Sequence, residues 1–447
     1  MQKKSLLALL LALTLLLSGC ALVSVDTEKD NARVIVDVNG ETVTKAVIHT
    51  TVDNTISQNQ YYQQLASYYG IDASNYPTDE ATVAQQVIDS YVNQLVAIQK
   101  AKELGLYEMT EEEKAEIETT GQDSYNGFLD SVASTYMPGS SLEGDELRAA
   151  AAKYAEENAV ATVDKRSTLE DFIASATDAK AVEKLQDYII KDVEVTEEEI
   201  KADFDAKVEQ AKTNYETDPD AYGTSRNAGS AVYYAPAGYR MVKHILIPLE
   251  TEDSSAMSEK QTVLNTAQTT LTTAQSALDN AAEDADKTAL QAALDEAQKA
   301  VDEAQAAYDE AKAAAFANIK EKADEVYAKA TAEGADFDAL IAEYSTDSMP
   351  SEGYAIREGF STFVEPFVNG AMALANPGDV SEPVESTYGY HIIQYVSDVE
   401  EGPVDLETVR DTISAALLST KQNETLADTM AQYVSEAQVK TFLDRLD

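Results

Sequence analysis

The sequence predicts an α+β chain in which a helical domain, built from N- and C-terminal segments, accompanies a smaller domain with a short sheet. Apolar residues recur at three- and four-residue steps over most of 44–213 and again over 405–446, the period of a helix packed on one face. Two distant segments, 239–247 and 390–396, instead alternate and are rich in β-branched residues, as strands are. At 447 residues the chain exceeds one ordinary core, so we expect more than one domain.

The chain begins with the features of a secretory signal. Two lysines precede an apolar run from Leu6 to Leu17, which is too short for a stable transmembrane helix. The run ends in Leu17-Ser-Gly-Cys20, which resembles the lipobox of bacterial lipoprotein signals, where cleavage before the cysteine frees it for acylation. Acyl chains on Cys20 would hold the mature protein at the outer face of the bacterial cell membrane. An ordinary secretory signal with an incidental cysteine is the alternative. The expected parts are a signal peptide over 1–19, a lipidated Cys20 and a tether over 20–31.

Composition excludes several classes of function. The formal net charge is −47, from 80 acidic against 33 basic residues, and no basic run occurs, so nucleic acid is not an expected partner. Cys20 is the only cysteine, which excludes a disulfide within the chain. The sequence has no Cys/His cluster and no phosphate-binding or dinucleotide fingerprint, so we expect neither a metal nor a cofactor. The negative charge favours basic or unfolded cationic clients, although it also serves solubility alone.

The helical domain is predicted over 32–216. It opens with a short strand that turns at Asn39-Gly40, the usual pair of a tight hairpin. The tyrosine pairs 61–62 and 68–69 lie in the helical region, either as core and rim or as part of a groove for clients. Residues 217–238 are rich in Gly, Ser and Asn without periodicity and are predicted to be a linker. One helix is marked by the apolar series Val83, Val87, Ile88, Tyr91, Leu95 and Ile98.

A helical insertion is predicted over 250–315, directly after the strand 239–247. From 258 to 315 the chain contains no Gly or Pro, and two apolar series with heptad spacing are separated by a polar segment. Two antiparallel helices that close on each other explain both series. This hairpin is either a spacer or a contact surface for a client or partner. The final segment, 399–447, is predicted to be helical and to pack on the domain over 32–216.

Two of the three histidines, His244 and His391, lie inside apolar strands, where a histidine is most often a hydrogen-bonded core residue. Their surroundings indicate more. Four segments resemble those of parvulin-type peptidyl-prolyl isomerases and follow the family's order along the chain. The resemblance implies a small antiparallel sheet with helices over 239–398, interrupted by the insertion. The four segments are Val242–Ile247, Ala335–Asp347, Gly378–Val384 and Tyr388–Ile393.

The resemblance also implies the residues of a site. By position, His244 and His391 form the family's histidine pair with Ser386 as the neighbouring hydroxyl, and Asp347 faces the substrate peptide bond. The family's Gly-Asp-Leu-Gly is replaced by Gly353-Tyr-Ala-Ile, so the wall of the proline pocket is either Ala355 or a shifted Ile356. The other expected substrate contacts are Phe363, Phe367 and Tyr388.

The layout as a whole resembles the PrsA and SurA type of extracytoplasmic foldase, in which N- and C-terminal helices form a chaperone domain beside the isomerase. The resemblance implies a peptidyl-prolyl cis/trans isomerase and chaperone that acts on X-Pro bonds of unfolded or newly exported proteins. Two alternatives remain open. One is a non-catalytic chaperone on a degenerate parvulin fold, because of the altered pocket wall. The other is an adaptor that docks a partner on the hairpin. A homodimer is also considered.

Overall fold

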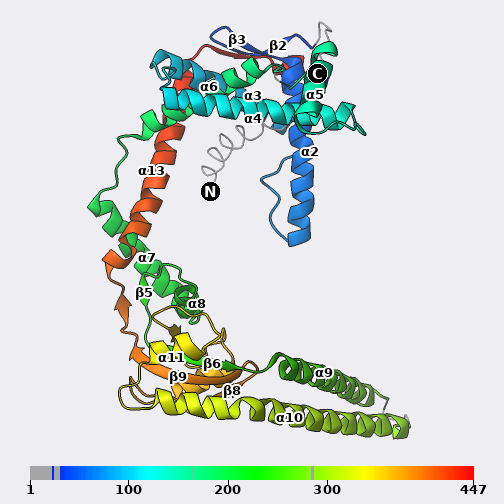
Figure 1. The fold of residues 1–447 in the computed structure, drawn as a ribbon, viewed down its shortest axis with the longest axis vertical. Coiled ribbons are helices and arrows are strands. Elements are labelled where there is room, and N and C mark those ends of the chain that lie inside the picture. The colour runs from blue at the N-terminus through cyan, green and yellow to red at the C-terminus, as the bar shows by residue number, and fades with distance from the viewer. Residues whose placement is uncertain (1–22, 25–30, 164, 283–285, 447) are drawn as a thin grey trace. The chain divides into compact units, whose positions relative to one another are not determined.

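The computed structural model describes residues 23–24, 31–163, 165–282 and 286–446 (Figure 1). The predicted signal peptide, Cys20 and most of the tether lie outside these residues. The chain divides into two compact units, 1–195 with 415–447, and 196–414. Helices dominate and the sheets are small and antiparallel, which confirms the predicted fold class. Within the described part of the chain, no helix is long and apolar enough to cross a membrane.

The first unit joins both ends of the chain in one three-stranded sheet. Its order is β11-β2-β3, with β2 Val34–Val38, β3 Glu41–Thr44 and β11 Val439–Thr441 all antiparallel. The predicted turn is confirmed, with Asn39 and Gly40 at φ of 51° and 94°. Helix α13, Leu406–Glu436, is shorter than the predicted 405–446. The helical prediction is wrong for β11, because β-branched residues pair there with the open edge of β2.

Five helices of the first unit follow β3 in the chain, and two of them, α2 and α3, contact the sheet. The predicted apolar series is confirmed on α3, where Val83 and Ile88 are fully buried. The tyrosine pairs on α2 are exposed instead, with Tyr68 and Tyr69 at 82% and 67%, so a core position is excluded for both. A short pair, β1 Val23–Ser24 with β4 Val160–Ala161, completes the unit. The helices are α2 Lys45–Tyr69, α3 Glu80–Glu103, α4 Glu111–Tyr136, α5 Gly144–Glu157 and α6 Leu169–Ile190.

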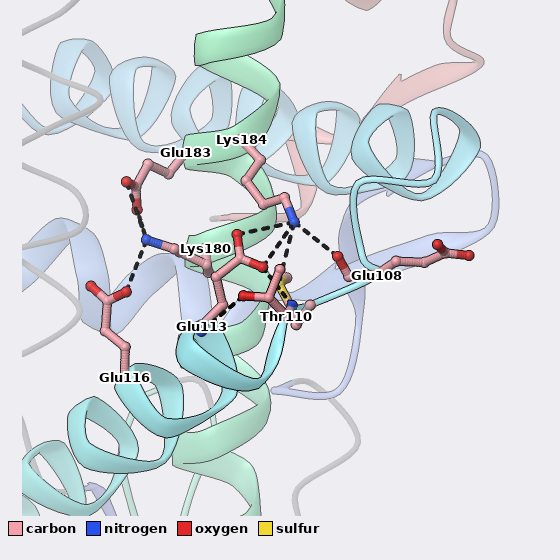
Figure 2. Close-up of polar contacts among 8 residues, drawn as sticks. Glu108, Thr110, Glu113, Glu116, Lys180, Glu183 and Lys184 are labelled. Carbon is pink, nitrogen blue, oxygen red and sulfur yellow. Dashed lines mark hydrogen bonds and ion pairs between the residues drawn. The ribbon is translucent and has the colours of Figure 1, made fainter.

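Two lysines one turn apart on α6 hold the start of α4 (Figure 2). Thr110 and Glu113 form a capping box at the N-terminus of α4. Lys184 Nζ donates to the Glu108 carbonyl at 2.9 Å and lies 3.1 Å from Glu113 Oε1, so one carboxylate serves both the cap and the ion pair. Lys180 bridges carboxylates of both helices, Glu116 at 3.0 Å and Glu183 at 3.1 Å. These contacts fix where α4 begins relative to α6.

The second unit is built on a four-stranded antiparallel sheet of order β7-β6-β9-β8. Central β6 is flanked by β9 along its whole length and by β7 near its start. One hydrophobic cluster joins β6 and β9 to α10 and α11, and a second joins β6, β7 and β9 to α12. The elements are β6 Arg240–Pro248, α10 Thr288–Ala330, α11 Phe337–Tyr344, β7 Tyr354–Ile356, α12 Glu365–Met372, β8 Val384–Ser386 and β9 Gly389–Asp398.

The inserted hairpin consists of α9, Thr251–Asp279, and the N-terminal half of α10, which lie side by side (Figure 1). The C-terminal half of α10 carries Phe316, Ile319 and Val326 into the core against the sheet. One helix of 43 residues therefore serves both the hairpin and the domain.

Residues 217–238 are not the irregular linker that their composition predicts. After α7, Glu197–Thr217, they form α8, Ala221–Asn227, and β5, Tyr234–Ala235, which pairs with β10, Gly402–Pro403. Tyr222 is buried in the core, and the Asn227 side chain bonds both the N–H and the C=O of Ala355. Side chain-to-backbone bonds hold this segment in place of a periodic apolar face, which is why its pattern indicated a linker.

Candidate active site

The two strand histidines lie side by side in the centre of the sheet. His391 on β9 is opposite Leu246 on β6, two residues from His244, so both histidines project from the same face. Their Nδ1 atoms are 3.1 Å apart and their ring centroids 5.2 Å apart. Both side chains are buried. Two strands distant in sequence thus place two titratable rings in direct contact.

Asp347 and Ser386 extend this contact to a chain of four side chains. Asp347 Oδ2 is 2.8 Å from His244 Nε2 at one end, and Ser386 Oγ is 2.7 Å from His391 Nε2 at the other. Asp347 lies in the loop after α11, where Ser345 Oγ accepts from the N–H groups of Leu246 and Asp347 and so ties the loop to β6. All four residues expected from the resemblance are therefore within hydrogen-bond distance of a neighbour.

The charges of these groups determine which atom donates in each of the three hydrogen bonds. The hydrogen bond from His244 lowers the pKa of Asp347, against the effect of partial burial, so Asp347 is a carboxylate at neutral pH. Burial, and then the neighbouring His244, lower the pKa of His391 to about 4, so its ring is neutral. When each ring carries one proton, one arrangement satisfies every atom. Ser386 donates to His391 Nε2, His391 Nδ1–H donates to His244 Nδ1, and His244 Nε2–H donates to Asp347.

Aromatic rings line the same face. Phe367, on α12, is buried with its ring centroid 5.0 Å from His244 and 5.2 Å from His391. Phe363 is partly buried and lies 5.5 Å from Phe367, in an edge-on arrangement. The structure thus brings the two phenylalanines expected in a proline pocket beside the histidine pair.

The tetrapeptide that carries the expected pocket wall also brings a tyrosine to the site. Ala355 and Ile356 are both fully buried, in the core cluster that also contains Phe367. Tyr354, which the sequence reasoning missed, has its ring 4.8 Å from Phe363 and 5.9 Å from His244. The available signal was its place directly after Gly353, in the tetrapeptide that departs from the family pattern.

Tyr388, the last residue expected to contact the substrate, lies next to Ser386. The Tyr388 side chain is 60% exposed, while its backbone N–H donates to Ser386 Oγ at 3.1 Å. Its backbone therefore contacts the hydroxyl of Ser386, and its carbonyl also accepts from the Leu249 N–H at 3.0 Å. Among the described residues, no group of three or more His, Cys, Asp or Glu side chains could hold a metal ion.

Comparison with known families gives two matches within the chain. Residues 281–397 match the family model of the PPIC-type PPIASE domain, and residues 1–131 match that of the SurA-like N-terminal domain. The first match begins inside the hairpin and does not include β6 with His244, because the insertion separates β6 from the rest of the domain. The predicted resemblance to an isomerase with a SurA-like N-terminal part is confirmed.

The chain is also similar to curated proteins named as foldases. The chain is 22% identical over 431 residues to the foldase protein PrsA of Clostridium acetobutylicum, which covers 94% of this chain and 91% of the relative. It is 35% identical over 125 residues to foldase protein PrsA 2 of Listeria innocua, covering 27% of this chain and 42% of the relative. A 71-residue stretch is 44% identical to foldase protein PrsA 1 of Listeria monocytogenes, covering 15% of this chain and 24% of the relative.

Solved structures were also compared. The foldase protein PrsA of Streptococcus pneumoniae aligns over 93% of this chain and 97% of its own, at 14% identity and a TM-score of 0.19. PrsA of Bacillus subtilis aligns over 91% and 93%, at 16% identity and a TM-score of 0.18. A SurA-like chaperone of Campylobacter jejuni aligns over 70% and 94%, at 16% identity and a TM-score of 0.25.

Proposed function

We propose that this chain, which carries a PPIC-type peptidyl-prolyl isomerase domain, is a foldase that isomerises X-Pro bonds of unfolded or newly exported proteins at the outer face of the bacterial cell membrane. The observation that carries the proposal is the continuous chain Asp347–His244–His391–Ser386 beside Phe367. It combines a fixed carboxylate with an apolar aromatic surface, which are the two elements that the reaction needs.

The reaction requires no nucleophile. Rotation about an X-Pro bond passes a barrier of about 18–20 kcal/mol because the amide C–N bond has partial double-bond character. That character comes from a resonance form with negative charge on the carbonyl oxygen. A carboxylate held near this oxygen makes the charge-separated form less favourable, and the twisted state, which lacks it, becomes relatively more stable. Asp347 is the side chain in the site with the charge for this role.

Gripping the proline ring is the second contribution. Phe367 is buried against the histidines and the partly buried Phe363 packs on it, so the two rings form an apolar wall with no group that would compete for the substrate carbonyl. A ring held on this surface stays in place while the preceding carbonyl rotates. This grip lowers the barrier to the extent that the surface binds the ring more tightly in the twisted state than in the planar one.

The histidines position the carboxylate and need not transfer protons. In the neutral arrangement each ring donates one hydrogen bond and accepts another, so the orientation of Asp347 is transmitted from Ser386 through two buried rings. No step of bond rotation requires a proton to leave the chain.

Chaperone action and membrane attachment belong to the remainder of the proposal. We assign the first to the unit that joins both chain ends, with the match to the SurA-like N-terminal domain as support. We assign the second to Cys20, which follows the apolar run 6–17. A Cys20→Ser variant is expected to lose partitioning into detergent after phase separation of cell extracts, while the wild type partitions there. Equal partitioning of both would overturn the lipid anchor.

A non-catalytic chaperone is the second candidate, and the observation that favours it is Tyr354, which packs on Phe363 from the tetrapeptide that departs from the family pattern. Refolding of a client whose slow phase is limited by proline isomerisation separates the two. The foldase predicts a faster slow phase with wild type and not with Asp347→Asn, whereas Asp338→Asn, an exposed carboxylate paired with Lys243, serves as matched control. Suppressed aggregation without any effect on the slow phase would support the chaperone alone.

A further inference from the structure

Tyr354, on the edge strand β7, contacts the same oxygen of Asp347 as His244 does. Its hydroxyl lies 3.4 Å from Asp347 Oδ2, the same oxygen that accepts from His244 at 2.8 Å, and 3.0 Å from the Ser348 carbonyl. Partial burial, and then the Asp347 carboxylate, raise the pKa of Tyr354 to about 12, so the hydroxyl keeps its proton at neutral pH and can only donate to these acceptors.

The backbone is arranged to place this ring. Tyr354 is the first residue of β7 and is paired with Val242 on β6. Gly353 before it has φ of +87°, and a Cβ there would lie 2.2 Å from the Val242 carbonyl oxygen. Only glycine permits this approach of β7 to β6. The position of the tyrosine thus follows from the strand pairing, and its ring packs on Phe363 rather than extending into solvent.

We propose that Tyr354 is a positioning residue for the isomerase reaction, which holds the Asp347 carboxylate in place as a second side-chain hydrogen-bond donor to the oxygen that His244 contacts. The inference rests on the proposed role of Asp347. Two side-chain donors from different strands, β6 and β7, reach one oxygen of the carboxylate, and a backbone hydrogen bond from Ser348 also lowers the pKa of Asp347.

Other ionisable groups do not replace this contact. Beside Tyr354, the titratable groups that act on Asp347 are His244 and, through it, His391. The nearby ion pairs Lys243–Asp338 and Arg226–Glu352 join opposite charges at 2.6 Å each. A change at the Tyr354 hydroxyl should therefore register at Asp347 and His244 before it registers elsewhere.

The test uses Tyr354→Phe in the full chain, which removes the hydroxyl and keeps the ring. The chain has three histidines, so their ring ¹⁵N–¹H signals can be assigned with single-histidine variants. With one donor lost, the His244 hydrogen bond to Asp347 strengthens and its Nε2–H signal is expected to move downfield. Catalysis of tetrapeptide exchange is expected to fall roughly two- to fivefold in kcat, with KM nearly unchanged.

Tyr234→Phe is the matched control, because it removes another tyrosine–carboxylate hydrogen bond, to Glu401 at 2.8 Å, outside the site. It should change neither the His244 signal nor kcat. An unmoved His244 signal in Tyr354→Phe would overturn the proposal. Full activity in Asp347→Ala would instead show that Asp347 has no catalytic role, which is a failure of the proposed function. A moved His244 signal in Tyr354→Phe would in that case still show the contact between Tyr354 and Asp347, so the two failures can be told apart.

Discussion

His244 and His391 contact each other through Nδ1 atoms that are 3.1 Å apart, a distance at which the two nitrogens share a single proton. One ring must therefore accept what the other donates. Because the outer nitrogens are bonded to Asp347 and Ser386, the choice of acceptor sets the direction of the whole chain. The most direct consequences concern pH.

The stability of the sheet should fall in mild acid because of His391. Its pKa is about 4 in the folded protein against 6.5 for an ordinary histidine, so the unfolded chain binds a proton that the folded chain does not. The contribution of the neutral ring is complete above pH 6.5 and is lost as the pH falls toward 4, by at most about 1.4 kcal/mol per pH unit. Hydrogen exchange of β6 and β9 amides from pH 7.5 to 5 measures this slope. His391→Gln is expected to flatten it, and an identical slope in both proteins would contradict the assignment.

Gly353 should be intolerant of a side chain. Gly353→Ala places a Cβ 2.2 Å from the Val242 carbonyl oxygen at φ of +87°, so β7 must move away from β6 and carry Tyr354 with it. We expect a loss of about 2 kcal/mol or more in stability and a marked loss of isomerase activity. Gly359→Ala is the control, because Gly359 has φ of +70° but open space around its Cβ position. It should cost only about 1 kcal/mol, as measured by urea unfolding, and equal losses in the two variants would refute the close approach.

The distal hairpin should be dispensable for catalysis. Met257 and Ala315, near its base, are buried in the core, whereas most of the described residues among 262–282 and 286–304 are exposed. Replacing 262–304 by a short Gly-Ser turn is expected to leave the catalysed exchange rate of a tetrapeptide within about twofold, since the aromatic surface and the histidines are untouched. A large loss of activity on tetrapeptides would show that the hairpin supports the site. Loss of client refolding with intact tetrapeptide activity would point to client or partner contact.

Lys184 should contribute more to the stability of the first unit than an ordinary surface lysine does. Its side chain is 23% exposed and bonds both the Glu108 carbonyl and the Glu113 carboxylate, which also caps α4 (Figure 2). Lys184→Met should lower the melting temperature by roughly 2–4 °C, followed by circular dichroism. Lys114→Met breaks an exposed ion pair with Glu111, within α4, and should leave the melting temperature nearly unchanged. Similar melting temperatures of the two variants would contradict the shared role of Glu113.

Much of the site was predictable because its parts lie in segments with strong local patterns. His244 and His391 are in alternating strands, and Asp347 and Ser386 follow by position in motifs that keep the family's order. Their mutual hydrogen bonds depend on strand register, which the sequence does not display. The antiparallel pairing of Leu246 with His391 decides that the two rings meet.

The missed features depend on tertiary contacts without a periodic signal. Tyr354 enters the site because β7 pairs with β6 over only three residues. The segment 217–238 is ordered through single contacts such as those of Asp220 with Arg357 and of Asn227 with Ala355. Strand β11 exists because β2 offers an open edge to the last residues of the chain. In each case a distant partner overrides a weak local preference.

Two-dimensional NMR exchange on a proline tetrapeptide tests the central claim most directly, using the full chain without its signal segment. The account predicts catalysed cis/trans exchange by the wild type, a fall of about tenfold or more in Asp347→Ala and in His244→Ala, and no change in Asp338→Ala. Exchange at the uncatalysed rate with wild type, or full activity in both site variants, would contradict it.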